Sequence, residues 1–286
     1  MKAEFLEPAS MAEAAALLAQ YGDDAKLIAG GTAVVLMYKQ KLIAPGVFIS
    51  LGRIKDHNYV RFSEDGLHIG ALTLLSEAEK SDTLLQANPA LAHALGVVGN
   101  VRIRNQATVG GNLAEADYAS DPPAMLVALN ASVKTIRPDG GREIPLDEFF
   151  YGFYTTALEP DEIISEVIVP SLSVNARSTY LKFTSRSAED RPCVGVAAAA
   201  DFDRDGKCGR LRVVIGAAVE IPQRLPDIEA QAVGERLSDE LIDAIANGYA
   251  QSLDPLEDGR GSAWYRREMI KVFVRRALKE VRNGDR

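Results

Sequence analysis

The sequence has few cysteines, no long apolar run and no overall excess of positive charge. Its two cysteines, Cys193 and Cys208, form no Cys-x-x-Cys pair and cannot supply the four thiolates of an iron–sulfur cluster. No apolar stretch reaches 18 residues, and acids at positions 4, 7 and 13 interrupt the start of the chain. These features argue against a transmembrane helix and a signal peptide. We therefore expect a soluble, cytoplasmic protein.

The charge balance argues against a protein that binds nucleic acid non-specifically. The 286 residues include 32 Lys or Arg and 40 Asp or Glu, which gives a net charge of −8, whereas binding to phosphates needs a basic field. Residues 260–286 are the exception, with nine basic and three acidic residues. We interpret this segment as a solvated helix face, the favoured reading, or as a docking surface for an acidic partner.

The first part of the chain has the pattern of alternating strands and helices. Ser10 and Glu13 have the spacing of a capping box, which predicts a helix over residues 11–20. An apolar run at residues 25–29 breaks at Gly30-Gly31 and resumes at 34–37, which indicates strand, glycine turn and helix. The alternation continues to about residue 170, as in α/β proteins.

The length suggests two domains, and residues 171–179, which are mostly small and polar, predict the boundary. Strand-like segments follow at residues 180–183, 194–202 and 208–219. From about residue 227 the chain is mainly helical and ends in an amphipathic helix. The sequence therefore predicts a small antiparallel sheet beside helices, and an α+β fold class overall.

Two double-glycine turns, at residues 30–31 and 110–111, are the main functional signal. Each follows an apolar segment, and without a Cβ the backbone can approach a ligand and direct N–H groups at an anion such as phosphate. Neither matches Gly-x-Gly-x-x-Gly or a P-loop. A single pair is more often a simple tight turn. Two pairs in one domain favour a shared long ligand, and a dinucleotide would be long enough.

Three charged residues near the second turn are further candidates. Arg102 and Arg104 would face one way on an extended segment and could offset a diphosphate, although a solvent-facing strand edge explains them equally well. Asp121 precedes two prolines, so it could cap the following helix or accept hydrogen bonds from a ribose. The spacing alone favours the cap.

Acid–base, nucleophilic and metal-dependent catalysis find little support in the sequence. His57, His68 and His93 lack the mutual spacing of metal ligands, and no Gly-x-Ser-x-Gly elbow occurs. Cys193 has no recognisable histidine partner, which disfavours it as a nucleophile. We expect no catalytic residue and no metal ligand in this chain, which holds a cofactor instead.

Several motifs together resemble the FAD-binding medium subunit of molybdenum hydroxylases, the family of carbon monoxide dehydrogenase and xanthine dehydrogenase. The first flavin motif of that family is similar to Ala29-Gly30-Gly31-Thr32. The second is similar to Thr108-Val109-Gly110-Gly111-Asn112 with Ala116-Asp117 and Ser120-Asp121-Pro122. The similarity continues through residues 161–164 and 180–183 to Arg186 and residues 189–190, and so covers nearly the full chain.

The resemblance implies an FAD-binding domain over residues 1–173, made of two α/β subdomains (about 1–57 and 58–173), and a C-terminal domain over 178–286. It also implies that residues 28–34 and 108–112 surround the FAD diphosphate, and that three further residues contact the cofactor. Ala33 stands where many relatives have a polar residue. Segment 191–193 is expected near the isoalloxazine. The implied FAD contacts are Ile28, Ala29, Gly30, Gly31, Thr32, Ala33, Val34, Thr108, Val109, Gly110, Gly111, Asn112, Asp121, Ile164 and Lys182.

The function that the resemblance implies is electron transfer within a complex. Substrate would be oxidised at a molybdenum cofactor on a large subunit, and electrons would pass through [2Fe–2S] centres on a small subunit to FAD in this chain. The expected assembly is a dimer of heterotrimers. Two alternatives stay open, namely a scaffold subunit that has lost its cofactor and a self-contained FAD oxidase.

Overall fold

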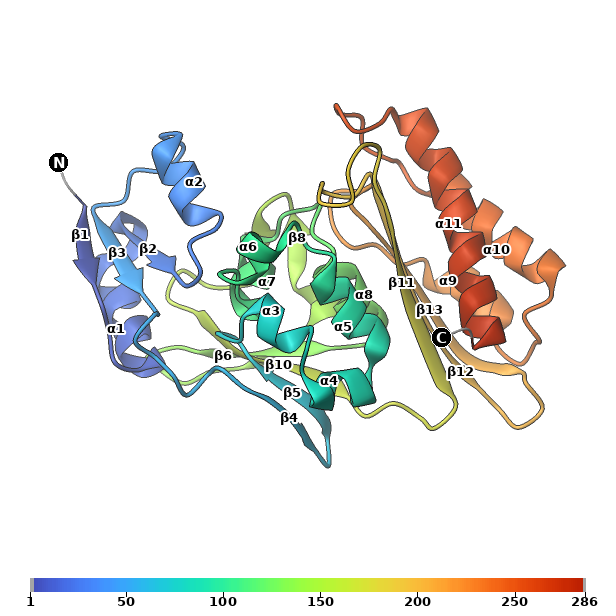
Figure 1. Ribbon diagram of the computed structural model, residues 1–286, viewed down its shortest axis with the longest axis horizontal. Helices are drawn as coiled ribbons and strands as arrows, with labels where there is room; N and C mark the ends of the chain where they lie inside the picture. Colours follow the sequence, from blue (N-terminus) through green and yellow to red (C-terminus); the bar gives the residue numbers. More distant parts are fainter. Residues whose placement is uncertain (1–2, 285–286) are drawn as a thin grey trace.

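The structure is a computed structural model that describes residues 3–284 and arranges three main sheets along the long axis of the molecule (Figure 1). It contains both parallel and antiparallel sheets with helices packed on them, which confirms the predicted α+β class. No helix within residues 3–284 has the length and apolar character needed to cross a membrane.

The first sheet is small and parallel, with the strand order β1-β3-β2. Helix α1 packs on it, and its start confirms the predicted capping box: Ser10 Oγ accepts the Glu13 N–H at 3.1 Å, and the Glu13 carboxylate accepts the Ala9 N–H at 2.7 Å. The elements of this part are β1 (Glu4–Leu6), α1 (Met11–Tyr21), β2 (Ala25–Ile28), α2 (Val34–Lys39) and β3 (Val47–Ser50), with a 3₁₀ turn at Gly22–Asp24.

The second sheet is antiparallel, with the order β4-β5-β10-β6-β7, and short helices cover one of its faces (Figure 1). Its strands are β4 (Val60–Ser63), β5 (Gly66–Gly70), β6 (Ser132–Ile136), β7 (Glu143–Pro145) and β10 (Ile163–Pro170). The helices are α3 (Leu75–Ala78), α4 (Asp82–Ala87), α5 (Pro89–Gly96), α6 (Val101–Arg104), α7 (Val109–Glu115) and α8 (Pro122–Ala128). A hairpin of β8 (Phe150–Gly152) and β9 (Thr155–Thr156) completes this part, with a 3₁₀ turn at Leu146–Glu148 before it.

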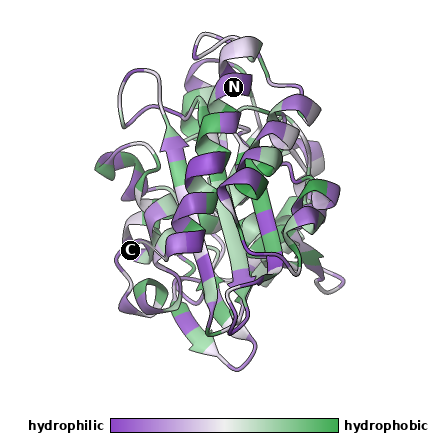
Figure 2. Cartoon of the chain, turned by 90° about the vertical axis from the view of Figure 1, so that its right-hand side faces the viewer, coloured by the Kyte–Doolittle hydropathy of each residue, from purple (hydrophilic) through white to green (hydrophobic). Residues whose placement is uncertain are grey.

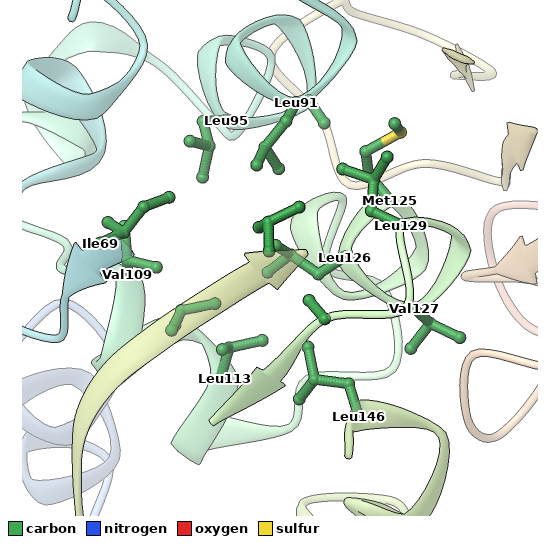
Figure 3. Close-up of a cluster of buried hydrophobic side chains, with 14 of the residues drawn as sticks. Ile69, Leu91, Leu95, Val109, Leu113, Met125, Leu126, Val127, Leu129 and Leu146 are labelled. Carbon is green, nitrogen blue, oxygen red and sulfur yellow. The ribbon is translucent and has the colours of Figure 1, made fainter. Parts of the chain in front are cut away.

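The main hydrophobic core lies between these helices and the second sheet (Figure 3). Helix α8 is buried on every side, because one side faces the core helices and the other faces the third sheet. Leu126 of this helix is fully buried and lies in the centre of the cluster. Its surroundings explain why the run from residue 122 to 128 is apolar all round, without an exposed stripe.

The third sheet, with the order β11-β12-β13, is antiparallel and buried on both faces. Ala197 and Ala199 of β12 belong to the main core, whereas the alternating Val196 and Ala198 belong to a second core under the C-terminal helices. A strand buried on both faces reads as a continuous apolar run. The elements of this part are β11 (Ala176–Phe183), β12 (Val194–Phe202), β13 (Cys208–Gly216), α9 (Pro226–Glu229), α10 (Asp239–Ser252) and α11 (Ala263–Asn283), with a 3₁₀ turn at Ala230–Ala232.

The basic C-terminal segment forms helix α11, whose apolar stripe packs on the third sheet while much of its charge is paired within the molecule. Figure 2, viewed from this end, shows hydrophilic residues on the outward turns of the front helices. Arg282 pairs with Asp239 at 2.6 Å, Arg275 pairs with Asp243, and both acids lie on α10. Contacts between α10 and α11 therefore account for part of this basic surface.

Replacing Leu126 by alanine tests the role of α8 in the core. We expect the free energy of unfolding to fall by about 3 kcal/mol, because a fully buried leucine is lost and a cavity remains. Urea unfolding followed by circular dichroism measures the change. Leu42→Ala is the matched control, since Leu42 is 69% exposed and its loss should cost less than about 0.5 kcal/mol. Equal losses in the two variants would contradict the buried position of α8.

Candidate functional site

The two double-glycine turns, which are far apart in the sequence, lie against each other in the structure. Gly30 abuts the backbone of Gln106, so that a Cβ at residue 30 would collide with the Gln106 carbonyl oxygen. A Cβ at Gly111 would come within 3.9 Å of the Ala29 side chain. The turn after β2 and the segment that enters α7 therefore form one continuous surface between the first and second sheets.

The first turn presents backbone N–H groups that are free to bind a ligand. Within residues 3–284, the turn's backbone bonds include Val35 N–H to Gly31 O, but the N–H groups of residues 30–34 donate to no described partner. Gly31 has φ +71°, a conformation that favours glycine, and α2 has no side-chain cap at its start. The seven predicted contacts from Ile28 to Val34 form this turn, and consecutive free amides of this kind can bind an anion.

The second turn differs, because its amides are already used inside the protein. Thr108 caps α7, and its hydroxyl accepts the Gly111 N–H at 3.1 Å. The amides of Val109 and Gly110 donate to Thr73 O and Ala71 O, which join α7 to the end of β5. Together with the Asn112 amide, which donates to Thr108 O, these bonds leave no amide at 109–112 for an anion. The second turn instead lets a ligand come close to its backbone, since Gly111 is exposed and has no side chain.

The charge distribution around the two turns favours an anionic ligand. Residues 25–55 contain five Lys or Arg and no Asp or Glu, and residues 83–114 contain two Arg and again no acid. These acid-free segments belong to a chain with 40 acidic residues. Because the turns of both segments meet, neither segment brings a carboxylate of its own that would repel a diphosphate, and the acids at Glu115, Asp117 and Asp121 follow the second segment.

The prediction that Arg102 and Arg104 face one way on an extended segment is wrong. Asn100 caps a short helix, α6, by accepting the N–H groups of residues 102 and 103. Residues two apart on a helix point in nearly opposite directions. Arg104 turns inward, where it pairs with Glu79 at 3.1 Å, while Arg102 is exposed. The two guanidinium groups therefore do not form a joint clamp.

Asp121 stands at the start of α8, as predicted, but its side chain does not cap that helix. Its carboxylate accepts hydrogen bonds from the Tyr180 hydroxyl at 2.8 Å and the Lys182 ammonium at 3.0 Å. Burial raises the pKa of Asp121 to about 6, against the opposing effects of Lys182 and Tyr180. The structure therefore brings together two predicted site residues, Asp121 and Lys182, as an ion pair with 3% and 7% of their side chains exposed.

Ile164 lies behind the second turn and not on its surface. Its side chain is buried in the main core, next to a bulge of β10 between residues 164 and 166. The following residue, Ser165, accepts the Ala71 N–H, and Ala71 in turn accepts the Gly110 N–H. Ile164 thus packs behind the second turn, on its core side. Its contact with a cofactor stays a prediction.

The sequence did not predict the pairing of two side chains, Tyr180 and Arg191, that join these elements. Tyr180 is completely enclosed and reaches Asp121, and its position two residues before Lys182 on a strand was the available signal, because such residues share a face. Arg191 pairs with Asp117 at 2.6 Å and so holds the start of β12 beside the end of α7. The segment predicted to lie near the isoalloxazine, residues 191–193, therefore contacts the loop that follows the second turn.

The fold and these turns define an FAD-binding oxidoreductase subunit. The family model for the FAD binding domain in molybdopterin dehydrogenase matches residues 1–172, and the model for the CO dehydrogenase flavoprotein C-terminal domain matches residues 179–281. The chain belongs to the FAD-binding medium subunits of the molybdenum hydroxylase family. The resemblance seen in the sequence is confirmed.

Comparisons with individual proteins agree with this assignment. The chain is 32% identical to the glyceraldehyde dehydrogenase medium chain of Sulfolobus acidocaldarius over 91% of each protein, and 33% identical to the nicotine 6-hydroxylase medium subunit of Paenarthrobacter nicotinovorans, over 97% and 96%. Its structure matches carbon monoxide dehydrogenase from Hydrogenophaga pseudoflava with a TM-score of 0.94 at 32% identity, covering 98% of this chain and 96% of the other. It also matches quinoline 2-oxidoreductase from Pseudomonas putida 86, with a TM-score of 0.92 at 25% identity, covering 99% of this chain and 98% of the other.

Replacing Gly30 by alanine tests whether the contact between the turns is needed for FAD binding. The added methyl group collides with the Gln106 carbonyl and separates the turns, so we expect FAD to bind about 100-fold more weakly, or about 2.7 kcal/mol. Quenching of FAD fluorescence by the apoprotein measures the affinity. Gly259→Ala is the matched control, since a Cβ there meets nothing within 4 Å. Unchanged affinity in a folded Gly30→Ala protein would show that the contact is dispensable.

Proposed function

We propose that this chain carries FAD as the electron-transfer subunit of a molybdenum hydroxylase complex, between [2Fe–2S] centres on a partner and an external acceptor. The observation that carries the proposal is the meeting of the two glycine turns, where the free amides of residues 30–34 lie within one acid-free segment and the second turn lies within the other. A dianionic diphosphate needs such an electropositive site. Membership in an FAD-binding family identifies the cofactor that contains this group.

In this proposal the chain binds and orients the cofactor and supplies no catalytic acid or base. The amides of the first turn hold the diphosphate, and the second turn, residues 108–112, lets it approach closely at Gly111. Asp121 and Lys182 fix the segment that carries the second turn, and Ile164 packs behind that turn. Bound FAD supplies redox chemistry that can accept single electrons and deliver two.

The other redox centres are assigned to partner chains. A [2Fe–2S] cluster takes four thiolate or imidazole ligands, and the two cysteines here are both buried and on separate strands or turns. We assign the clusters to a small subunit and the molybdenum cofactor to a large subunit, in a dimer of heterotrimers. Several relatives are named medium chain or medium subunit, which supports a complex of this kind. Free thiols at Cys193 and Cys208 fit a cytoplasmic location.

The proposal also divides the chain into functional parts. Residues 1–173 form the FAD-binding domain, with subdomains of about 1–57 and 58–173, and residues 178–286 form the C-terminal domain. The first family model ends at residue 172 and the second begins at residue 179, which supports a boundary between the domains there. The two glycine turns fall in different subdomains, so the cofactor would lie between them.

Purification of the native complex through a tag on this chain tests the proposal. We expect FAD, molybdenum and iron to be recovered together, with about one FAD per tagged chain, because the turns at residues 30–31 and 110–111 meet to form a single site. Cofactor extraction measures FAD, and elemental analysis measures the two metals.

Other results would favour the alternatives. FAD without molybdenum or iron would support a self-contained FAD oxidase, and molybdenum and iron without FAD would support a scaffold subunit. Either result would overturn the proposal. The tagged Gly30→Ala chain provides an internal comparison, since it should still recover both metals but lose FAD.

A further inference from the structure

A buried hydrogen-bonded cluster joins the third sheet to the FAD-binding domain. It consists of Tyr180 and Lys182 from β11 and Asp121 from the start of α8. The carboxylate of Asp121 accepts from Tyr180 through Oδ1 and from Lys182 through Oδ2. All three side chains are more than nine-tenths buried. Charged groups at such depth are costly unless their partners are held in place.

Lys182 joins two helix ends in addition to forming the ion pair. Its ammonium donates to Val97 O at 2.7 Å, at the carboxyl end of α5, and to Asp121 at the start of α8. An ammonium is favourable at the negative end of a helix dipole. The cation therefore holds both ends of the segment 97–121, which contains α6 and the second glycine turn.

The same segment is tied to the ligand surface at two further points. Ser120 precedes Asp121, and its hydroxyl donates to Asn112 Oδ1 of the second turn at 2.9 Å. Gln106 lies in the middle of the segment and contacts Gly30 of the first turn. A shift of Asp121 or of Val97 would therefore move the surface on which the two turns meet.

Tyr180 holds Asp121 in a fixed orientation. Its hydroxyl packs closely against Gly195 on the neighbouring strand, because a Cβ there would lie only 2.5 Å from the hydroxyl oxygen. The groups that face the Asp121 carboxylate are Lys182 and Tyr180 from β11 and Asp117 from its own loop. Of these, Tyr180 donates to Oδ1 of the carboxylate, while Lys182 donates to Oδ2 and to Val97 O.

We propose that Tyr180 is a positioning residue for the FAD site, which acts by holding Asp121 so that the Lys182 ammonium fixes both ends of segment 97–121. The inference rests on the proposed function, because it assigns a task at the same site. It makes FAD affinity depend on a strand of the C-terminal domain. Tyr180 itself need not touch the cofactor.

Tyr180→Phe, assayed in the full chain, tests this inference by removing one oxygen atom. We expect FAD to bind about tenfold more weakly at pH 7, because the buried carboxylate loses one of its two donors. Fluorescence quenching measures the affinity. Tyr249→Phe is the matched control, since Tyr249 is equally buried and its hydroxyl bonds Val213 O and Glu229 in the second core. It should lower thermal stability and leave FAD affinity unchanged.

The pH profile separates positioning from a merely structural role. In the wild-type chain, Asp121 takes up a proton as the pH falls through about 6, and the ion pair with Lys182 is lost, so FAD affinity should fall there. The Tyr180 hydrogen bond lowers the pKa of Asp121, so its removal should move this midpoint to higher pH. Tyr249→Phe should leave the midpoint in place.

A second variant keeps the inference testable if Tyr180→Phe does not fold. Gly195→Ala displaces the hydroxyl without removing it, and the same weaker binding and shifted midpoint are expected. Wild-type affinity and midpoint in either folded variant, or equal changes in Tyr249→Phe, would overturn the inference. Absence of FAD from the wild-type complex would instead overturn the proposed function.

Discussion

The contact between Gly30 and the backbone of Gln106 is the constraint on which the site depends. Because residue 30 has no Cβ, the turn after β2 can lie directly on the segment that leads into α7. This contact brings two acid-free segments together in a chain whose net charge is −8. The two turns differ in their backbone amides. Those of the first turn have no partner within the described residues, whereas those of the second turn bond the chain at the end of β5 and so fix α7 there.

The third sheet links the cofactor-binding part of the molecule to the C-terminal helices. Its central strand is buried on both faces, and small residues such as Ala197 and Ala199 let α8 pack closely on one of them. From that same face Tyr180 and Lys182 reach Asp121 and the end of α5. The packing that stabilises the interface therefore also places a buried ion pair beside the second glycine turn.

Elements with strong local signals were predictable from the sequence. The capping box at Ser10 and the strand, glycine turn and helix around residue 30 are formed by neighbouring residues, and the structure has both. The alternation of residues 101–104 was misleading, because four residues fit an extended or a helical segment equally well and the Asn100 cap decides for the helix. Asp121 was misread for a similar reason, since its partners lie about 60 residues away.

The fold class, the family and the two glycine turns could be predicted from the sequence, because they depend on local propensities and on motifs of adjacent residues. The free amides of the first turn, the inward turn of Arg104 to Glu79 and the pairing of Asp121 with Lys182 could be seen only in the folded chain. Hydrogen-bond partners and burial are set by the packing of segments that are distant along the chain. A motif can therefore point to a candidate turn without showing which of its backbone amides are available.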